Sequence, residues 1–288
     1  MPVDIPWSEQ AAAPGSAFWR GLRTNRLALV GGGILAGFLL LALTAPLIAP
    51  HDPFEQDLYN RLSQPSLTHP FGTDDFGRDV LSRVVHGARI SLRIGVVAVM
   101  IALVLGTAVG ITSGYWGGLI DAVLMRAMDL MLAFPSILLA ICIVAVLGPG
   151  LENAMLAVGI VAVPQYARLV RASALSVRQM DYVQAARALG AGDLRILSRS
   201  VLPNCLAPLI VQSTLGLATA ILDAAGLSFL GLGAQPPLPE WGAMLSGARE
   251  LVLKAPWTLT FPGLAIFLTV LGFNLLGDGL RDALDPRT

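Results

Sequence analysis

Residues 181–204, DYVQAARALGAGDLRILSRSVLPN, are a polar, arginine-bearing stretch between two apolar runs that are each long enough to cross a bilayer. This arrangement decides how the chain folds, because such a stretch belongs at a membrane surface. Its first half predicts a short amphipathic helix, since apolar residues recur there at three- and four-residue spacing. These residues are Tyr182, Ala185, Ala186 and Leu189.

Two glycines and a second amphipathic stretch follow. Gly190 and Gly192 are predicted to break the first helix. Asp193 is placed to cap a second helix, which Leu202-Pro203 is predicted to end. The apolar face of that helix is Leu194, Leu197 and Val201, and its basic face is Arg195 and Arg199. A helix–glycine–helix unit on a membrane surface is suited to docking a partner and not to catalysis.

The same stretch resembles the coupling-loop signature of bacterial ABC importer permeases, which reads E-A-A, three residues, G, nine residues, I-x-L-P. Gln184 stands where the signature has Glu, and Ser200 stands where it has Ile. Gln184 follows Asp181 by three residues, so the two can still form a capping box at the helix start. The resemblance implies that six residues couple this chain to an ATPase subunit. They are Gln184, Ala185, Ala186, Gly190, Leu202 and Pro203.

The composition is that of an integral membrane protein. The chain has 288 residues, of which 55% are hydrophobic and 13% are charged, and its mean hydropathy is +0.70. Soluble domains carry about 25% charged residues. The basic residues are dispersed and are not interleaved with aromatic residues, which argues against a nucleic-acid partner.

Six apolar runs approach or reach the length that spans a bilayer. They lie at 27–48, 94–115, 127–147, 154–170, 206–226 and 259–277. The fourth run is short and carries Pro164, Gln165 and Tyr166, so we expect it to be kinked and to face the bundle interior. The predicted fold class is an all-α integral membrane protein with six transmembrane helices.

Six spans put both termini on one side of the membrane, and the basic residues indicate which side. Most of the 19 Lys and Arg residues fall on the side of the termini and of residues 181–204, so that side is predicted to be cytoplasmic. The predicted organisation is a cytoplasmic tail at 1–26, a first helix at 27–49, an outer loop at 50–90 that closes with an amphipathic segment at 79–93, a five-helix domain at 91–280 and a cytoplasmic tail at 281–288.

Further stretches resemble the dipeptide and oligopeptide permease family, C-type subunit. They are HPFGTDDFGRD (69–79), GLSFLGLGAQPPLPEWGAML (226–245) and NLLGDGLRDALDPR (274–287), while PNCLAPLIVQ (203–212) and AILDAAGLSFLG (220–231) are most similar to the dipeptide branch. The resemblance extends from Phe18 onward. It implies a type I ABC importer permease fold in the bacterial inner membrane, with residues 181–204 as cytoplasmic coupling helices.

The resemblance also implies partners. These are a homologous B-type permease in a heterodimer, two ABC ATPase subunits that bind ATP and Mg²⁺, an extracytoplasmic peptide-binding protein and membrane lipid. The chain has no GxxxxGK[ST], HExxH or GxSxG motif, so we expect no catalytic residues, no metal and no cofactor of its own. Dipeptides, oligopeptides, glutathione and a nickel chelate remain open as substrates. A secondary transporter is the alternative from a different class.

Two polar residues inside predicted spans are candidates for the translocation path. Asp223 interrupts an apolar run near the outer end of the fifth span, where an unpaired carboxylate is costly. It is a candidate contact for the ammonium group of a peptide, but an ion pair or helix cap that shapes the outer gate is the interpretation we favour. Gln165 in the fourth span is a candidate lining residue, with an interhelical hydrogen bond as the alternative.

Histidines and cysteines give weaker signals. His51, His69 and His86 all lie in the outer loop, but their spacing matches no chelating motif, so structural roles are favoured over a metal site. Cys142 and Cys205 lie in or beside predicted spans, and we expect two packed thiols and not a disulfide or metal pair.

Overall fold

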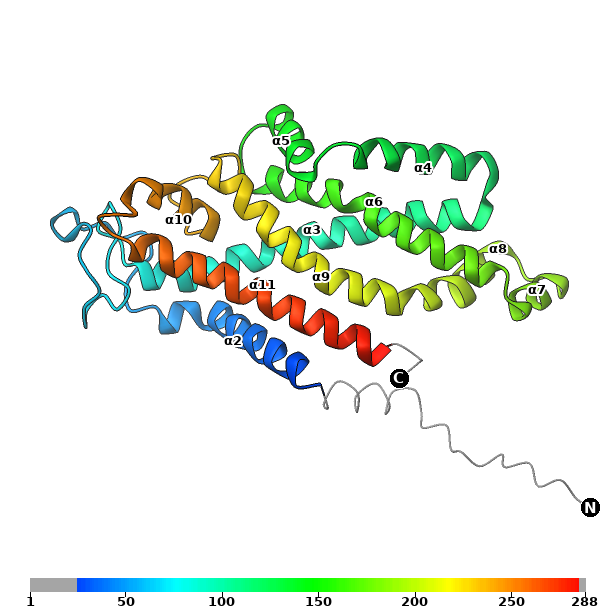
Figure 1. The fold of residues 1–288 in the computed structure, drawn as a ribbon, viewed down its shortest axis with the longest axis horizontal. Coiled ribbons are helices and arrows are strands. Elements are labelled where there is room, and N and C mark those ends of the chain that lie inside the picture. Colours follow the sequence, from blue (N-terminus) through cyan, green and yellow to red (C-terminus); the bar gives the residue numbers. More distant parts are fainter. Residues whose placement is uncertain (1–24, 285–288) are drawn as a thin grey trace, which may run out of the picture.

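The computed structural model describes residues 25–284, which form an elongated bundle of helices (Figure 1). Five long helices are α2 (Arg26–Ile48), α3 (Val80–Trp116), α6 (Leu151–Arg178), α9 (Leu202–Phe229) and α11 (Trp257–Leu284). All five are long and apolar enough to cross a membrane. Each contains one of the predicted spans, and the all-α membrane fold class is confirmed.

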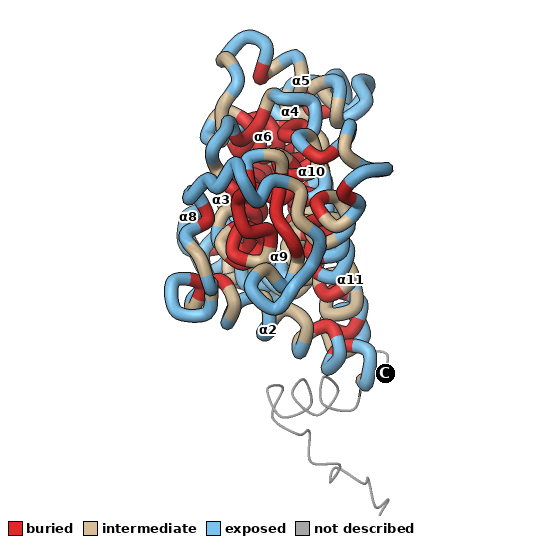
Figure 2. The backbone as a smooth tube through the Cα atoms, turned by 90° about the vertical axis from the view of Figure 1, so that its left-hand side faces the viewer, coloured by how far each residue is buried: buried red, intermediate tan, exposed pale blue. Residues whose placement is uncertain are grey.

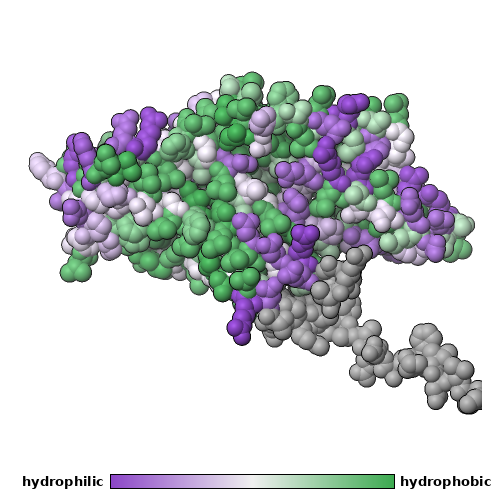
Figure 3. All heavy atoms as spheres, viewed as in Figure 1, coloured by the Kyte–Doolittle hydropathy of each residue, from purple (hydrophilic) through white to green (hydrophobic). Residues whose placement is uncertain are grey.

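The bundle has two unlike ends. The loop end, at the left of Figure 1, holds residues 49–79 and helix α10 (Trp241–Ala248). The opposite end holds residues 181–204, which we call the knuckle and which contain α7 (Asp181–Ala188) and α8 (Asp193–Ile196). Hydrophobic residues cover most of the middle of the visible face, and hydrophilic residues gather toward both ends (Figure 3). A bundle that spans a bilayer requires this distribution.

The third predicted span, 127–147, is not one straight helix. It is divided between α4 (Gly118–Leu132) and α5 (Ser136–Leu147), whose axes differ by 95°. Pro135 lies at the break. Proline causes such a break because it has no N–H to donate and because it disfavours the helical conformation of the preceding residue, here Phe134. The described chain therefore has five unbroken candidate spans and a sixth if the bent pair crosses the membrane as a unit.

Residues 79–93, predicted as a separate amphipathic segment, are continuous with the second span. Asp79 is the N-cap of α3, and the 37 residues of this helix include both regions. Its length of roughly 55 Å far exceeds the roughly 30 Å of a hydrocarbon core. The apolar face of its first turns packs on the fully buried Trp241, whose indole N–H donates to the Val84 carbonyl at 3.0 Å. Tertiary contacts thus make the predicted loop segment the first turns of the helix that contains the second span.

Helices α3 and α6 form the centre of the bundle, where small residues allow a close approach. Gly106, Gly110 and Gly114 recur every four residues on α3, and a Cβ at any of them would collide with residues 166–174 of α6. Close packing of this kind is a main source of helix association in lipid. Pro164 and Tyr166 are buried, as predicted for a fourth span that faces the interior, but Gln165 between them is exposed. Figure 2 shows the buried residues gathered inside the bundle.

Helices α2 and α11 bring the two ends of the described chain together. Asn25, the N-cap of α2, donates from Nδ2 to Asp282 Oδ2 at 3.2 Å. Both ends therefore lie on one side of the bundle, as an even number of crossings requires. Helix α11 extends to Leu284, so the predicted tail at 281–288 begins inside a helix. Most of the predicted tail at 1–26 and residues 285–288 lie outside the described residues.

Candidate functional site

The knuckle is two helical segments joined by a glycine cap. Helix α7 is followed by Gly190, whose φ of +82° lies in the left-handed region that favours glycine. The Gly190 N–H donates to the Arg187 carbonyl and the Ala191 N–H donates to the Ala186 carbonyl, both at 3.0 Å. These two bonds form a Schellman motif. Nothing lies within 4 Å of the position of an added Cβ at Gly190, so its backbone conformation, and not crowding, requires glycine.

The start of α7 differs from the predicted capping box. Met180 occupies the N-cap position, and Asp181 is the first helical residue. The Gln184 side chain instead donates to the Gln179 carbonyl at 3.2 Å. The reason is the two-residue connection from α6, which ends at Arg178 and leaves the extended N-cap conformation to Met180.

The second half of the knuckle is not a separate helix ended by Leu202-Pro203, as predicted. Helix α8 passes through a π-helical turn at Leu197–Val201 into α9, and the Leu202 N–H donates to the Leu197 carbonyl five residues back. This wider turn accommodates Pro203, which has no N–H and whose ring would clash with the carbonyl four residues back in an α-helix. Leu202 and Pro203 therefore join the knuckle directly to a membrane span.

One buried tyrosine ties both halves of the knuckle to the bundle. Tyr115, at the end of α3 and 3% exposed, donates to Asp193 Oδ1 at 2.6 Å and accepts from Arg187 Nη2 at 3.1 Å. Asp193 was predicted to cap α8, but Gly192 is the N-cap and Asp193 binds Tyr115 instead. Sequence reasoning missed Tyr115. The available signal was a tyrosine at the polar end of an apolar run, where a buried hydroxyl usually finds a partner.

The predicted apolar face of α7 points mostly away from the bundle. Val183 is 1% exposed and packs inward, whereas Leu189 is 89% exposed and Leu194 on α8 is 81% exposed. Gln184, Ala185, Gly190, Leu202 and Pro203 are exposed, and Ala186 is half-buried. The knuckle thus presents apolar side chains on both sides of Gly190 that residues 25–284 leave uncovered.

Gln165 and Asp223, which were predicted separately as path residues, line one small cavity between α3, α6 and α9. The cavity has a volume of about 20 Å³, and Tyr166 and Gly216 also line it. Gln165 is exposed and Asp223 is half-buried. Among residues 25–284 neither side chain has a hydrogen-bond or ion-pair partner, so the ion pair or helix cap favoured for Asp223 is not found within the described residues. An interhelical hydrogen bond of the kind considered for Gln165 comes instead from Tyr166, whose hydroxyl donates to the Gln212 carbonyl at 3.4 Å.

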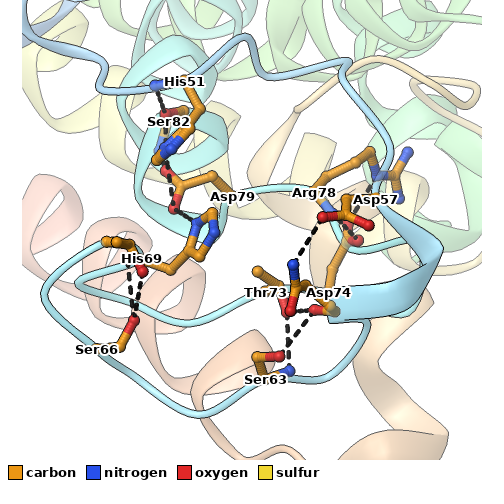
Figure 4. A network of polar contacts seen from close by, with 12 residues as sticks. His51, Asp57, Ser63, Ser66, His69, Thr73, Asp74, Arg78, Asp79 and Ser82 are labelled. Atoms are coloured by element: carbon orange, nitrogen blue, oxygen red, sulfur yellow. Dashed lines mark hydrogen bonds and ion pairs between the residues drawn. The ribbon is translucent and has the colours of Figure 1, made fainter.

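The loop end is held by buried charged residues (Figure 4). Asp74 accepts from Arg78 Nε at 2.7 Å and from the backbone N–H groups of Phe76 and Arg78 at 2.9 Å. Arg83 is 5% exposed, lies 3.5 Å from Asp74 through Nε and donates to the Pro53 carbonyl at 3.0 Å. Partners within the same chain therefore compensate these buried charges.

The two cysteines differ in how far they are buried. Cys205 on α9 is buried, but Cys142 on α5 is exposed, so only one of the two predicted packed thiols is packed. The prediction treated every residue of an apolar run as buried. In a membrane bundle many of them face lipid or a partner instead.

Two family models match the sequence. Residues 106–288 match the model described as binding-protein-dependent transport system inner membrane component, and residues 14–65 match the N-terminal TM domain of oligopeptide transport permease C. The chain is 54% identical over 277 residues to the dipeptide transport system permease protein DppC of Alkalihalophilus pseudofirmus, with 96% of this chain and 91% of the relative covered.

Other relatives carry different substrate names. The chain is 50% identical to the di/tripeptide transport system permease protein DppC of Pseudomonas aeruginosa, over 96% of this chain and 93% of the relative. It is 48% identical to the glutathione transport system permease protein GsiD of Escherichia coli O6:K15:H31, over 100% of this chain and 94% of the relative.

Among solved structures, the fold is similar to inward-facing conformations of the MetNI methionine ABC transporter. The TM-score is 0.57 at 20% identity, over 70% of this chain and 96% of that chain. A crystal structure of an amino acid ABC transporter with histidines gives a TM-score of 0.53 at 14% identity, over 69% of this chain and 92% of that chain. These likenesses are of fold, and they confirm the type I importer permease architecture.

Proposed function

Because the chain belongs to the family of binding-protein-dependent transport system inner membrane components, we propose that it is a permease subunit through which an ABC importer moves di- and oligopeptides. The observation that carries the proposal is the knuckle. It presents uncovered apolar side chains next to a glycine cap, and its second half continues as one helical path from Asp193 to Phe229. A displacement at the knuckle would pass along this path to Asp223.

The proposal includes partners. An ABC ATPase would dock on the exposed face of the knuckle, including Gln184, Ala185 and Gly190, and a second ATPase subunit would serve a homologous permease. ATP and Mg²⁺ would be bound by those ATPases. An extracytoplasmic peptide-binding protein would deliver the substrate at the loop end. Support for the second permease comes from the cavity residues, because Gln165 is exposed at mid-bundle and needs a polar neighbour in lipid.

The orientation follows from the basic residues. We place the knuckle and both termini in the cytoplasm and the loop end outside, in the inner membrane of a bacterium. Cysteines introduced at positions 188 and 60, in a background without Cys142 and Cys205, test this in intact cells. A membrane-impermeant maleimide should label position 60 and leave position 188 unlabelled. The reverse pattern contradicts the orientation.

Reconstitution tests the function. Proteoliposomes would contain this chain, its companion permease and the two ATPases, with the binding protein added outside. We expect uptake of a labelled dipeptide that requires ATP in the compartment of the ATPases. Uptake that an ion gradient drives without ATP would instead identify a secondary transporter.

A glutathione importer is the second candidate, because the chain is also 48% identical to a glutathione permease. Competition in the same proteoliposomes separates the two. An excess of unlabelled dipeptide should abolish uptake of the labelled one, and an excess of glutathione should leave it unchanged. The opposite result favours glutathione.

Asp223 and Gln165 are proposed to line the path. A peptide ammonium would pair with the Asp223 carboxylate, which has no partner among residues 25–284. Uptake of matched free and N-acetylated dipeptides by Asp223→Asn tests the contact. A contact predicts a larger loss for the free peptide, whereas an equal loss for both identifies a gate residue.

A further inference from the structure

Three side chains with metal-ligating atoms meet at the loop end (Figure 4). His51 follows α2, His69 lies in the loop and Asp79 is the N-cap of α3. His69 Nδ1 lies 3.0 Å from Asp79 Oδ1, and His51 Nδ1 lies 3.9 Å from the same oxygen. The three ligand atoms all lie within 4.8 Å of one another. Sequence spacing could not reveal this group, because the three residues come from three separate segments.

The Asp79 carboxylate is held in place before any ligand binds. Its Oδ2 accepts from the N–H and from the hydroxyl of Ser82, each at 2.7 Å, and the residue is 2% exposed. This leaves Oδ1 directed at the two histidines. Hydrogen bonds that orient a ligating group in this way are a regular part of metal sites and raise their affinity.

One nitrogen of the His51 ring is left without a hydrogen-bond partner within residues 25–284. Its Nδ1 is buried and has no hydrogen-bond partner among the described residues. The ring stacks on His69 with centroids 4.6 Å apart, and the backbone N–H of His51 donates to Ser82 Oγ at 3.1 Å, so the residue is held beside Asp79. A hydrogen bond from His69 to Asp79 would satisfy two of the three converging atoms and leave this nitrogen unpaired, which is costly.

The surroundings favour a cation. The cluster opens on a cavity of about 180 Å³ whose other lining residues include Asp52, Glu55 and Asp57. Acidic residues around a pocket raise the local concentration of cations. Among the residues that the structure describes, no lysine or arginine lines this cavity.

We propose that His51, His69 and Asp79 form a site for a divalent transition-metal ion, with Zn²⁺ as the representative ion. Two imidazoles and one carboxylate suit Zn²⁺, and three protein ligands leave a fourth position open toward the acidic cavity. Neighbouring ligands of tetrahedral Zn²⁺ are about 3.3 Å apart, so small ring rotations bring the three atoms into place. The bound ion would tie the outer loop to the end of α2 and the start of α3.

Direct metal titration tests the site. The full chain is purified in detergent, its affinity tag is removed and it is stripped of metal. Zn²⁺ is then titrated against a chromophoric chelator. We expect one equivalent to bind, and His51→Asn or His69→Gln to weaken binding at least about tenfold. The matched control is His86→Gln: its Nδ1 contacts the Ser82 carbonyl at 3.0 Å, it lies outside the cluster, and its loss should change the affinity less than about twofold.

Two further readouts keep the test decisive if a variant folds poorly. Zn²⁺ should slow hydrogen exchange of residues 50–79 in the wild type and in His86→Gln, but not in His69→Gln. Co²⁺ in the wild type should give the visible bands of a four- or five-coordinate ion with nitrogen and oxygen ligands. The proposal is overturned by no stoichiometric Zn²⁺ binding, by binding that survives loss of both His51 and His69, or by an octahedral or sulfur-ligated Co²⁺ spectrum.

Discussion

The two ends of the bundle differ in how far their charged side chains are buried. Five charged residues are buried among the described residues, and all five lie at the loop end: Asp74, Arg78, Asp79, Arg83 and Glu240. At the knuckle the charged residues are exposed, and so are apolar residues such as Leu189 and Leu194. The buried charged groups at the loop end have hydrogen-bond partners within the chain, whereas the charged groups at the knuckle are open to water. Exposed apolar residues occur at both ends, since Leu58 and Leu67 at the loop end are exposed as well.

This difference predicts different consequences of substitution. At the loop end a substitution should reduce stability, because it leaves a buried group without its partner. At the knuckle a substitution should reduce coupling with little effect on stability, because water replaces what is lost. Four experiments test this contrast, from the largest expected effect to the smallest.

Arg78→Met should destabilise the protein most. It removes the 2.7 Å ion pair with Asp74 and leaves that largely buried carboxylate with the more distant Arg83. We expect a loss of about 3 kcal/mol in the free energy of unfolding. Thermal unfolding in detergent measures it. Arg93→Ala is the control, because the Arg93–Glu152 pair is exposed and should contribute less than about 1 kcal/mol. Equal effects of the two would show that the loop end is not held by buried charge.

Gly190→Val should abolish transport and substrate-stimulated ATPase activity while the complex still assembles. A β-branched residue at a φ of +82° costs about 1–3 kcal/mol, and the knuckle would change shape to relieve this strain. Gly192→Ala is the control, because Gly192 has a φ of −69° and an added Cβ meets nothing within 4 Å. Normal coupling in Gly190→Val, or equal loss in Gly192→Ala, would contradict the role of the glycine cap.

Tyr115→Phe should loosen the knuckle without unfolding the bundle. The change removes the hydroxyl that Asp193 and Arg187 share, which is worth about 1 kcal/mol because both partners are exposed to water. Hydrogen exchange of α7 should accelerate about fivefold, while that of α6 stays unchanged. Tyr59→Phe is the control at the loop end, because Tyr59 is fully exposed. Acceleration throughout the bundle would mean that Tyr115 supports the whole fold.

Asp75→Asn should have the smallest effect, and its size depends on pH. Burial, helped by the neighbouring Asp74 carboxylate, raises the pKa of Asp75 above 3.8. The folded protein therefore keeps this proton to a higher pH than the unfolded chain does. The stability that this proton contributes is complete below pH 3.8 and is lost as the pH rises through the folded pKa. Asp75→Asn should thus gain Tm relative to the wild type from pH 4 to 7. A constant difference over this range would contradict the assignment.

Much of the architecture could be predicted from the sequence. Five of the six spans lie within the observed helices, because an apolar run of this length has few alternatives to a helix in lipid. The glycine cap at Gly190 was also predictable, since its conformation depends on local backbone sterics. Pro135 is the sequence signal for the break in the third span, whereas apolar length alone predicts one unbroken helix there.

The remaining features depend on contacts between distant segments. The burial of Val183 in place of Leu189, the bond between Tyr115 and Asp193, and the meeting of His51 with His69 all require three-dimensional packing. Hydrophobic periodicity assigns a helix an apolar face but not the object that this face contacts. For that reason the periodicity of the sequence predicts the wrong buried side for α7.

The sequence by itself determined the membrane-spanning helical class, the glycine cap at Gly190 and the family resemblance, because apolar length and local glycine and proline chemistry act over a few neighbouring residues. The tertiary structure decided that the knuckle continues into α9, that Gln165 and Asp223 line one cavity, and that two histidines converge on Asp79. These features join residues far apart in the chain, and their geometry is set by how the helices pack against one another.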